Sequence, residues 1–275
     1  MVTNIRESIK RSVSPQSYQK LRHLKWRTSF YMPHLLASVF VRRSPKVDGF
    51  PKGSVSESFL RQIRDVNVFA PTKMCNVMTW HGSDKGRGWH NYTTIYSSLF
   101  ASRFNEPFVI LEVGLGTNNP NLISTMGVAG RPGASLRGWR ELFPNALVYG
   151  ADIDRDILFE EDRIKTFFVD QLDSAAIVAL WSQPGLTAGA DIIIDDGLHR
   201  FDGNSLFCDH SLEHLRPGGL YVIEDISNTE LDEWRKHLDT VYSKRFPDYE
   251  FALVELPNPL QDCDNNLFIV RHRPR

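Results

Sequence analysis

Two apolar runs of the sequence end in carboxylates, in a way that predicts a shared binding site. One run leads into Asp195 and Asp196, with His199 three residues later. The next leads into Glu224 and Asp225. If these runs are neighbouring strands about 4.8 Å apart, their ends can bring three oxygen ligands to one point. Carboxylates without thiolates suit Mg²⁺, with Ca²⁺ or Mn²⁺ as alternatives.

A single acid at a strand end is usually a helix cap or a solvated loop residue. Four acids and a histidine at adjoining strand ends predict more, because unpaired carboxylates repel one another and a dication removes that repulsion. Beside a metal ion that makes a bound hydroxyl acidic, His199 is predicted to be the general base. A satisfied structural histidine is the alternative.

An earlier strand predicts a cofactor site. The run V-I-L-E-V-G-L-G (109–116) is a buried strand that ends in Gly114 and Gly116, and glycines there let the backbone approach a ligand. A dinucleotide fold would require a third glycine and an immediate helix to hold a pyrophosphate, whereas a long loop follows here. The sequence contains no G-x-x-x-x-G-K-[ST] motif for a nucleoside triphosphate.

Polar residues after the next two strands extend this prediction. Asp152 lies 36 positions beyond Gly116, where its carboxylate can accept hydrogen bonds from a ribose diol. Asp170 and Gln171 end the third strand, at the edge where an adenine would be read. Each acid alone is equally well explained as a helix N-cap. Together with Glu112 they fit S-adenosylmethionine (SAM) better.

The elements that must position these residues alternate between short β-branched runs and helical stretches, which is typical of a parallel sheet with crossover helices. Five such units and a terminal hairpin predict an α/β, doubly wound, seven-stranded, mostly parallel sheet. The predicted strands are 108–113, 147–153, 164–169, 191–195, 219–226, 249–256 and 267–272. The predicted helices are 134–143, 174–181, 204–215 and 230–245.

Length and charge suggest an appendage on this domain. The chain has 275 residues and a net charge of -1, yet residues 1–50 carry ten basic against two acidic side chains. The rest carries 22 against 31, so a basic segment precedes an acidic body. We expect a basic helical arm over 1–50 with a linker at 44–53, a helical lid or connector over 51–105, and the α/β domain over 106–275.

The sequence gives no sign of membrane spanning or of disulfide bonds. Its most apolar early stretch, 30–41, is shorter than the roughly 20 residues that cross a bilayer, and it lacks a signal cleavage site. Cys75, Cys208 and Cys263 are odd in number and widely spaced, which indicates neither a disulfide framework nor a metal site. We therefore expect a cytoplasmic protein.

Several motifs in combination resemble one known family over residues 81–273. They are E-V-G-x-G, G-A-S-L-R-x-W-R-x-x-F-P-x-A-x-V-Y-G-x-D, D-D-G-x-H and Y-x-I-E-D, with an upstream G-S-D-K followed by H-x-Y. This combination resembles the metal-dependent class I SAM O-methyltransferases that act on sugars, typified by the mycinamicin and tylosin deoxysugar enzymes of macrolide biosynthesis. The resemblance implies a Rossmann-like methyltransferase domain over 106–275.

The resemblance also implies roles for single residues. Asp196, Glu224 and Asp225 correspond to metal ligands, and His199 corresponds to the base that takes a proton from a sugar hydroxyl. Lys85, His90 and Tyr92 fall in a lid over cofactor and substrate. The residues assigned to the SAM site are Glu112, Gly114, Gly116, Asp152, Asp170, Gln171, Asp195, Lys85 and Tyr92.

Two residues depart from the family pattern. Ser83 replaces the usual threonine, which is a mild change. Leu198 replaces the usual serine between Gly197 and His199, which removes a hydroxyl beside the reacting centre. The second departure indicates a different acceptor sugar or a differently held base.

The leading interpretation is SAM- and Mg²⁺-dependent methyl transfer to a hydroxyl of a sugar, on a glycan or a glycosylated natural product. One alternative keeps the cofactor and changes the acceptor to a catechol or another phenolic diol. A second is an inactive fold whose basic arm binds nucleic acid, and a third is a metal-dependent hydroxylase. We expect a saccharide partner, no nucleic acid, a homo-oligomer, and at most peripheral membrane contact through the arm.

Overall fold

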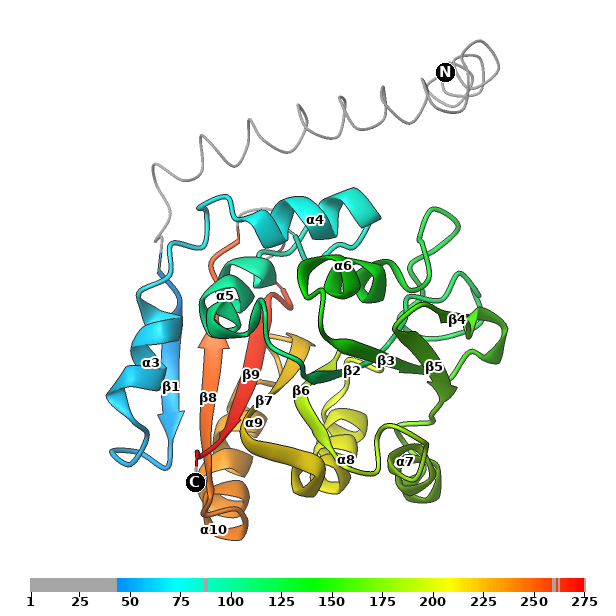
Figure 1. The fold of residues 1–275 in the computed structure, drawn as a ribbon. Helices are drawn as coiled ribbons and strands as arrows, with labels where there is room; N and C mark the ends of the chain where they lie inside the picture. The colour runs from blue at the N-terminus through cyan, green and yellow to red at the C-terminus, as the bar shows by residue number, and fades with distance from the viewer. Residues whose placement is uncertain (1–43, 87–88, 259–260, 262, 275) are drawn as a thin grey trace. The chain divides into compact units, whose positions relative to one another are not determined.

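The computed structural model describes residues 44–86, 89–258, 261 and 263–274. Predictions for the basic arm before residue 44 lie outside this part of the chain. The described residues form an α/β fold around one sheet, whose strand order is β1-β8-β9-β7-β6-β2-β3-β5-β4 (Figure 1). The predicted α/β class, with a doubly wound and largely parallel centre, is confirmed.

The centre of the sheet consists of five parallel strands, and a hairpin joins it antiparallel beside β7. Every residue of the strand before the G-x-G motif is buried, as its uninterrupted apolar run predicts. The parallel strands are β2 (Val109–Val113), β3 (Leu147–Asp152), β5 (Ile164–Phe168), β6 (Ala190–Asp195) and β7 (Leu215–Ile226), and the hairpin strands are β8 (Tyr249–Glu255) and β9 (Asn266–His272).

Two strands that the sequence did not predict lie at the sheet edges. β4 (Glu160–Glu161) pairs antiparallel with β5, and β1 (Lys46–Phe50) pairs antiparallel with β8. The segment 44–53 was predicted as a linker because of its prolines and glycines, and this prediction is wrong. Phe50 is only 2% exposed and belongs to the main hydrophobic core, so the short strand is part of the domain.

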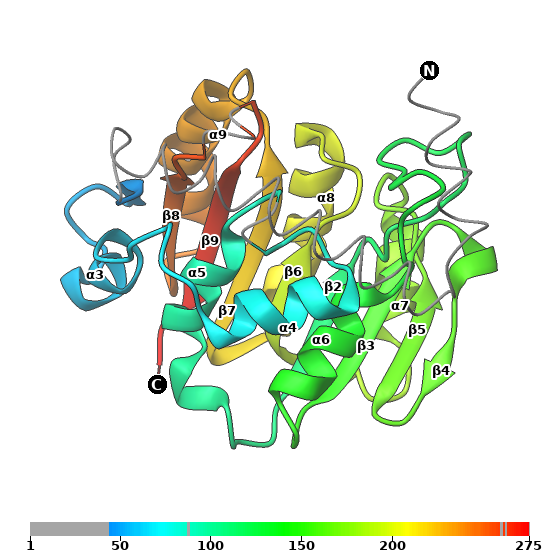
Figure 2. The same ribbon diagram turned by 90° about the horizontal axis from the view of Figure 1, so that it is seen from above.

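Helices cover both faces of the sheet (Figures 1 and 2). One layer holds α4 (Lys73–His81), α5 (Tyr92–Leu99) and α6 (Ala134–Leu142), and the other holds α7 (Ser174–Trp181), α8 (Phe201–Ser211), α9 (Leu231–His237) and α10 (Ser243–Arg245). α3 (Glu57–Arg64) lies beside β1. Short 3-10 turns occupy Ala101–Arg103, Arg155–Ile157 and Leu212–His214, and Leu238–Tyr242 forms a π-helical turn.

The helix boundaries follow local signals in most places. Thr72 caps α4 by accepting a 3.0 Å hydrogen bond from the Cys75 amide, and Asp173 caps α7 in the same way through Ala175. The observed helix α8 begins at Phe201, three residues before the predicted helix 204–215, and the last residue of that predicted range, Leu215, belongs to β7. The R-P-G-G sequence (216–219), which follows the predicted helix, forms the irregular start of β7.

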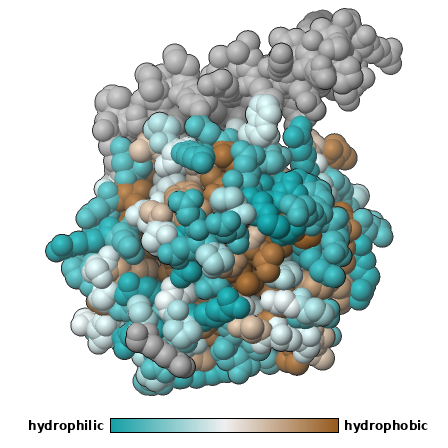
Figure 3. All heavy atoms as spheres, viewed as in Figure 1, coloured by the Kyte–Doolittle hydropathy of each residue, from teal (hydrophilic) through white to brown (hydrophobic). Residues whose placement is uncertain are grey.

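The outer surface is mixed in polarity. The face seen in Figure 3 is largely hydrophilic, with small apolar patches between the polar side chains. Among the described residues, no helix is both long and apolar enough to cross a membrane.

Candidate functional site at the carboxyl edge of the sheet

The predicted site residues meet because β6 and β7 run parallel and side by side. Asp195, the last residue of β6, is in register with Ile223, so Asp196 and the last residues of β7 lie at the same edge of the sheet. β6 also pairs with β2, where Asp195 stands opposite Val113, just before the G-x-G turn. The carboxyl ends of three adjacent parallel strands therefore converge on one point, which is where open α/β sheets bind ligands.

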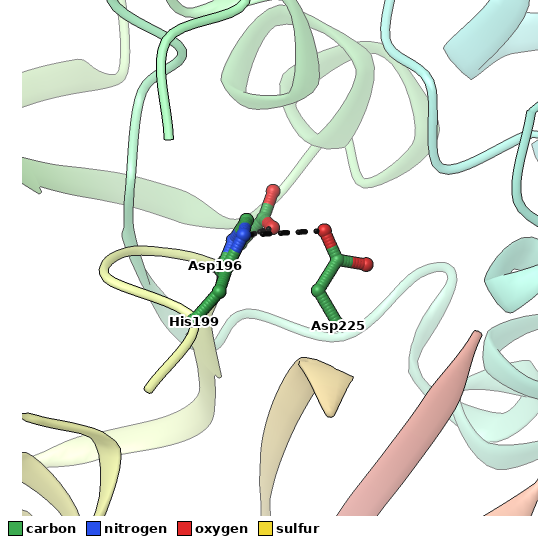
Figure 4. Close-up of side chains that lie close together, drawn as sticks. All are labelled: Asp196, His199 and Asp225. Carbon is green, nitrogen blue, oxygen red and sulfur yellow. Dashed lines mark hydrogen bonds and ion pairs between the residues drawn. The ribbon is translucent and has the colours of Figure 1, made fainter. Parts of the chain in front are cut away.

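Three of the predicted residues form a compact group at this point. Ligand atoms of Asp196, His199 and Asp225 all lie within 4.8 Å of one another (Figure 4). The Nε2 atom of His199 lies 3.1 Å from Oδ1 of Asp196, and its Nδ1 atom lies 3.5 Å from Oδ2 of Asp225. Two carboxylates and an imidazole at these distances match the donor types that divalent cations bind in proteins.

The backbone of this group is strained. His199 has a φ of 57° and Asp225 has a φ of 55°, in the left-handed region that residues with a Cβ atom rarely adopt. Such conformations cost about 1–3 kcal/mol each and persist where the surrounding structure enforces them. Two of the four described non-glycine residues with a positive φ therefore belong to the trio; the other two are Ser124 and Arg163.

The charges of the trio shift one another. Burial alone would lower the pKa of His199, but Asp225 and Asp196 face its ring and raise that pKa to about 10. Burial alone would raise the pKa of Asp196, yet the Lys85 ammonium and the His199 ring hold it well below its usual range. A cation on the carboxylates would remove the cause of the His199 shift.

Glu224, the third metal ligand implied by the resemblance, lies outside this trio. One of its carboxylate oxygens accepts a 2.5 Å hydrogen bond from Nζ of Lys85, and the other accepts one from the Tyr96 hydroxyl. Glu224 is 1% exposed, and burial raises its pKa well above the usual range. Both of its oxygens are therefore engaged inside the protein.

Lys85 and Tyr92, which the resemblance assigns to the lid and the SAM site, lie against the strand-end carboxylates. Lys85 pairs with Asp196 and Glu224, and the Tyr92 hydroxyl donates a 2.5 Å hydrogen bond to Oδ1 of Asp225. Both side chains are fully buried. His90, the third residue assigned to the lid, stacks on Tyr92 at 4.6 Å and is also buried.

The two glycines of the G-x-G motif are required by protein contacts as well as by any ligand. A Cβ atom at Gly114, whose φ is 90°, would lie 1.8 Å from the Asp196 carbonyl oxygen. One at Gly116 would lie 2.1 Å from the sulfur of Met126. Gly114 thus lets the end of β2 approach the loop that carries Asp196 and His199.

Glu112 faces the core rather than the strand ends. Its carboxylate accepts hydrogen bonds from the Ser135 hydroxyl and the Trp139 indole of α6, and it lies 3.5 Å from Nζ of Lys85. Burial raises its pKa. In this structure Glu112 ties β2 to α6 and to Lys85.

The other predicted SAM residues lie along the same edge, and each contacts backbone nearby. Asp152 accepts hydrogen bonds from the amides of Leu115 at 2.6 Å and Asp154 at 2.8 Å. Asp170 accepts one from the Leu172 amide at 2.9 Å. Asp152 thereby fixes the G-x-G turn, as a carboxylate bordering a ligand site would.

Gln171 and Asp195 support the loop that carries the trio. The Gln171 amide donates to Asp195 at 2.7 Å, and its carbonyl oxygen accepts from the Leu198 backbone amide at 2.8 Å. Burial raises the pKa of Asp195 to about 6, against the hydrogen bonds that the Gln171 amide and the Gly197 backbone amide donate. Asp195 is fully buried, so its role here is support of residues 196–199.

Several supporting residues were not assigned roles from the sequence. Tyr96 contacts Glu224, Tyr221 donates to Asp195 at 3.2 Å, and Asn265 lies 3.1 Å from Nδ1 of His90. Tyr96 belongs to the upstream motif that resembles the family but received no role from it, and Tyr221 lies in an apolar run, where a tyrosine is usually a core residue. Asn265 lies 175 positions from His90, and only the fold brings them together.

Comparison with known proteins gives relatives of one kind, although no family model matches the chain. The chain is 31% identical over 192 residues to the 8-demethyl-8-(2-methoxy-alpha-L-rhamnosyl)-tetracenomycin-C 3'-O-methyltransferase of Streptomyces olivaceus, which covers 68% of this chain and 45% of the relative. It is 37% identical over 143 residues to the demethylmacrocin O-methyltransferase of Streptomyces fradiae, covering 50% and 32%. The chain thus spans less than half the length of these curated relatives.

Solved structures agree on the fold. The MycE methyltransferase of the mycinamycin biosynthetic pathway, determined with Mg, SAH and mycinamycin VI, superposes with a TM-score of 0.55 at 24% identity, over 74% of this chain and 54% of MycE. That likeness shows the methyltransferase fold. Over the matched residues, this chain is a homologue of O-methyltransferases that are named for rhamnosyl tetracenomycins and for demethylmacrocin.

Proposed function

We propose that this chain is a SAM-dependent, Mg²⁺-dependent O-methyltransferase that acts on a hydroxyl of a sugar, most simply one carried by a glycosylated natural product. The observation that carries the proposal is the trio of Asp196, His199 and Asp225 at the strand ends beside the G-x-G turn. The names of its homologues, which specify rhamnosyl groups and numbered O-positions, support the sugar acceptor.

Asp196 and Asp225 would hold the cation, and the sequence resemblance adds Glu224. The donor set fits Mg²⁺, because it offers hard carboxylate oxygens without a thiolate. When bound, the ion would make an acceptor hydroxyl more acidic and fix its orientation. The cofactor would lie along Gly114, Gly116, Asp152, Asp170 and Gln171, the strand-end residues on the side of β2, β3 and β5.

His199 would take the proton from the acceptor hydroxyl as the oxygen attacks the methyl group of SAM. In that step the oxygen–carbon bond forms, the carbon–sulfur bond breaks, and S-adenosylhomocysteine (SAH) leaves. Asp196 and Asp225 lie on either side of the imidazole, 3.1 and 3.5 Å from its two nitrogens, so a cation held by both carboxylates would lie beside the base and would leave a ring nitrogen free to take the proton. The contribution of the protein is mainly orientation and electrostatic stabilisation.

Mass spectrometry on a panel of glycosides, with SAM and Mg²⁺, tests the proposal directly. We expect a methylated product from at least one glycoside, and loss of product when EDTA removes the cation. Catechols in the same panel separate the two acceptor classes. Methylation of catechols without any glycoside product would contradict the sugar assignment, and a hydroxylated product would contradict methyl transfer.

A further inference from the structure

Lys85 carries a buried ammonium group among three carboxylates. Its side chain is 1% exposed, and its Nζ atom contacts Asp196, lies 2.5 Å from Glu224 and lies 3.5 Å from Glu112. A buried charge is retained only where it is paired and hydrogen-bonded. The Lys85 ammonium therefore pairs with two carboxylates at the ends of β6 and β7, although Lys85 itself lies more than 100 residues earlier in the chain.

The position of Lys85 is set independently of these strands. Its backbone amide lies 3.3 Å from the Ser83 hydroxyl, and its carbonyl accepts a 3.2 Å hydrogen bond from the Thr93 amide in the first turn of α5. Gly82 ends α4 just before it in the left-handed conformation. The short connection between α4 and α5 therefore holds the Lys85 main chain, and the side chain reaches toward the strand ends.

Asp196 divides its two oxygens between this lysine and the trio. Oδ2 accepts from the Lys85 ammonium, while Oδ1 lies 3.1 Å from Nε2 of His199. A carboxylate held at one oxygen cannot rotate freely about its last torsion. Lys85 thus determines which Asp196 oxygen faces His199 and Asp225.

We propose that Lys85 is a positioning residue of the cation site, because it holds Asp196 so that Oδ1 faces the cation. Glu112 influences the cation site only indirectly, by holding Lys85. This inference rests on the proposed function insofar as it requires a cation at the trio. Glu112 fits this role because its own carboxylate is fixed by Ser135 and Trp139 of α6.

The test is Mn²⁺ binding by calorimetry, with SAH binding and the thermal midpoint measured on the same samples of the full chain. Lys85→Met removes the ammonium and keeps most of the side-chain volume. We expect Mn²⁺ binding to weaken by about 10- to 100-fold, the range typical for partners of metal ligands. SAH binding should remain, because the proposed function places the cofactor along Gly114, Gly116, Asp152, Asp170 and Gln171, and K85M changes none of these residues. Unchanged Mn²⁺ affinity in a folded K85M protein would overturn the proposal.

A double variant covers the case in which K85M does not fold. K85M/E112Q removes a buried carboxylate together with the ammonium, so less uncompensated charge is left in the core. Its reference is E112Q alone. The proposal predicts weaker Mn²⁺ binding in the double variant than in E112Q, and a smaller loss in E112Q than in K85M. Equal affinities of the double variant and E112Q, or a larger loss in E112Q, would overturn it.

Arg271→Met is the matched control. Arg271 pairs with buried Glu250 and stands opposite Leu220, five residues before Asp225 along β7, so R271M should lower stability without weakening Mn²⁺ binding. The outcomes also separate this inference from the proposed function. A wild-type protein that binds Mn²⁺ but methylates no glycoside would contradict the function alone, whereas one that binds no Mn²⁺ would contradict both.

Discussion

At the scale of single residues, the site is defined by which carboxylate atoms the protein already engages. Asp225 accepts from Tyr92 through Oδ1, and its Oδ2 faces His199 at 3.5 Å. Asp196 is divided in the same way between Lys85 and His199. Each acid of the trio therefore has one oxygen fixed by a buried donor and one turned toward the imidazole, which fixes the geometry before a ligand binds.

His199→Ala tests the role of the imidazole. We expect kcat to fall by about 10²- to 10⁴-fold, the usual contribution of general acid–base catalysis, because His199 is the imidazole that contacts both Asp196 and Asp225. SAM binding, measured by calorimetry, should be unchanged. His214→Ala, which removes a histidine stacked on Trp181 away from the site, is the control. A near-normal rate in H199A would exclude the assigned role.

At the scale of elements, the segment from Gly82 to Tyr96 is joined to the strand ends by several side chains. Lys85 reaches Asp196, Tyr92 reaches Asp225, and Tyr96 reaches Glu224. These three donors are buried, so both α5 and the connection that precedes it contribute side chains to the site. The resemblance assigns Lys85, His90 and Tyr92 of this segment to a lid, and in this structure Lys85 and Tyr92 contact the strand-end carboxylates directly.

Gly114→Ala tests the turn that lets the end of β2 approach the loop that carries Asp196 and His199. The new Cβ atom would lie 1.8 Å from the Asp196 carbonyl oxygen, in a residue whose φ is 90°. Gly218→Ala is the control, because Gly218 also has a positive φ but has nothing within 4 Å of a Cβ atom. We expect G218A to lose about 1–2 kcal/mol from backbone strain alone. G114A should lose more, and should also lose Mn²⁺ binding; equal losses of stability with intact Mn²⁺ binding would contradict this role.

Phe50→Ala tests whether β1 is part of the domain. Phe50 is 2% exposed in the main core, so its truncation should lower the free energy of unfolding by about 3–5 kcal/mol. Leu147→Ala, at a residue that is 46% exposed on β3, should cost much less. Urea unfolding of both variants gives the comparison. If the free energy of unfolding fell no more in F50A than in L147A, the interpretation of residues 44–53 as a linker would be correct after all.

At the scale of the whole molecule, the helical layer that contains α8 and α9 holds a histidine, His237, whose protonation should destabilise the folded protein at low pH. His237 packs edge-on against Phe201, Trp234 and Tyr242, and its Nε2 atom has no hydrogen-bond partner among the described residues. Burial lowers its pKa from the ordinary value of 6.5, with Asp209 and Glu233 opposing and Arg245 adding to the shift.

The sign of the resulting pH dependence follows from proton linkage. The unfolded chain takes up the His237 proton more readily than the folded protein, so the free energy of unfolding should fall as pH drops below about 6.5. In His237→Phe this loss should be absent. The wild-type thermal midpoint should therefore decrease more than that of H237F between pH 8 and pH 5, with H210F as the control for losing an imidazole. Parallel decreases in wild type and H237F would contradict the prediction.

Much of the architecture could be predicted from the sequence. The uninterrupted apolar runs fix five parallel strands and the terminal hairpin, and their polar ends predict the shared edge of Asp196, His199 and Asp225. The edge strand β1 could not be predicted, because prolines and glycines surround five residues whose pairing with β8 depends on chain about 200 residues away. Local patterns carry periodicity, and β1 is too short to show any.

What the sequence alone determined is the set of chemical groups and the edge of the sheet to which parallel strands deliver them. Tertiary structure decided which partner each of those groups contacts. Glu224 and Asp225 are adjacent in sequence, yet one faces a buried ammonium and the other faces an imidazole. Asp225 has a φ of 55° where the pairing of β7 with β9 shifts register, so the two adjacent side chains point in different directions. The partner that each of them meets comes from an element distant in sequence. For this reason the role of Lys85 emerges only when α4, α5 and the sheet are brought together.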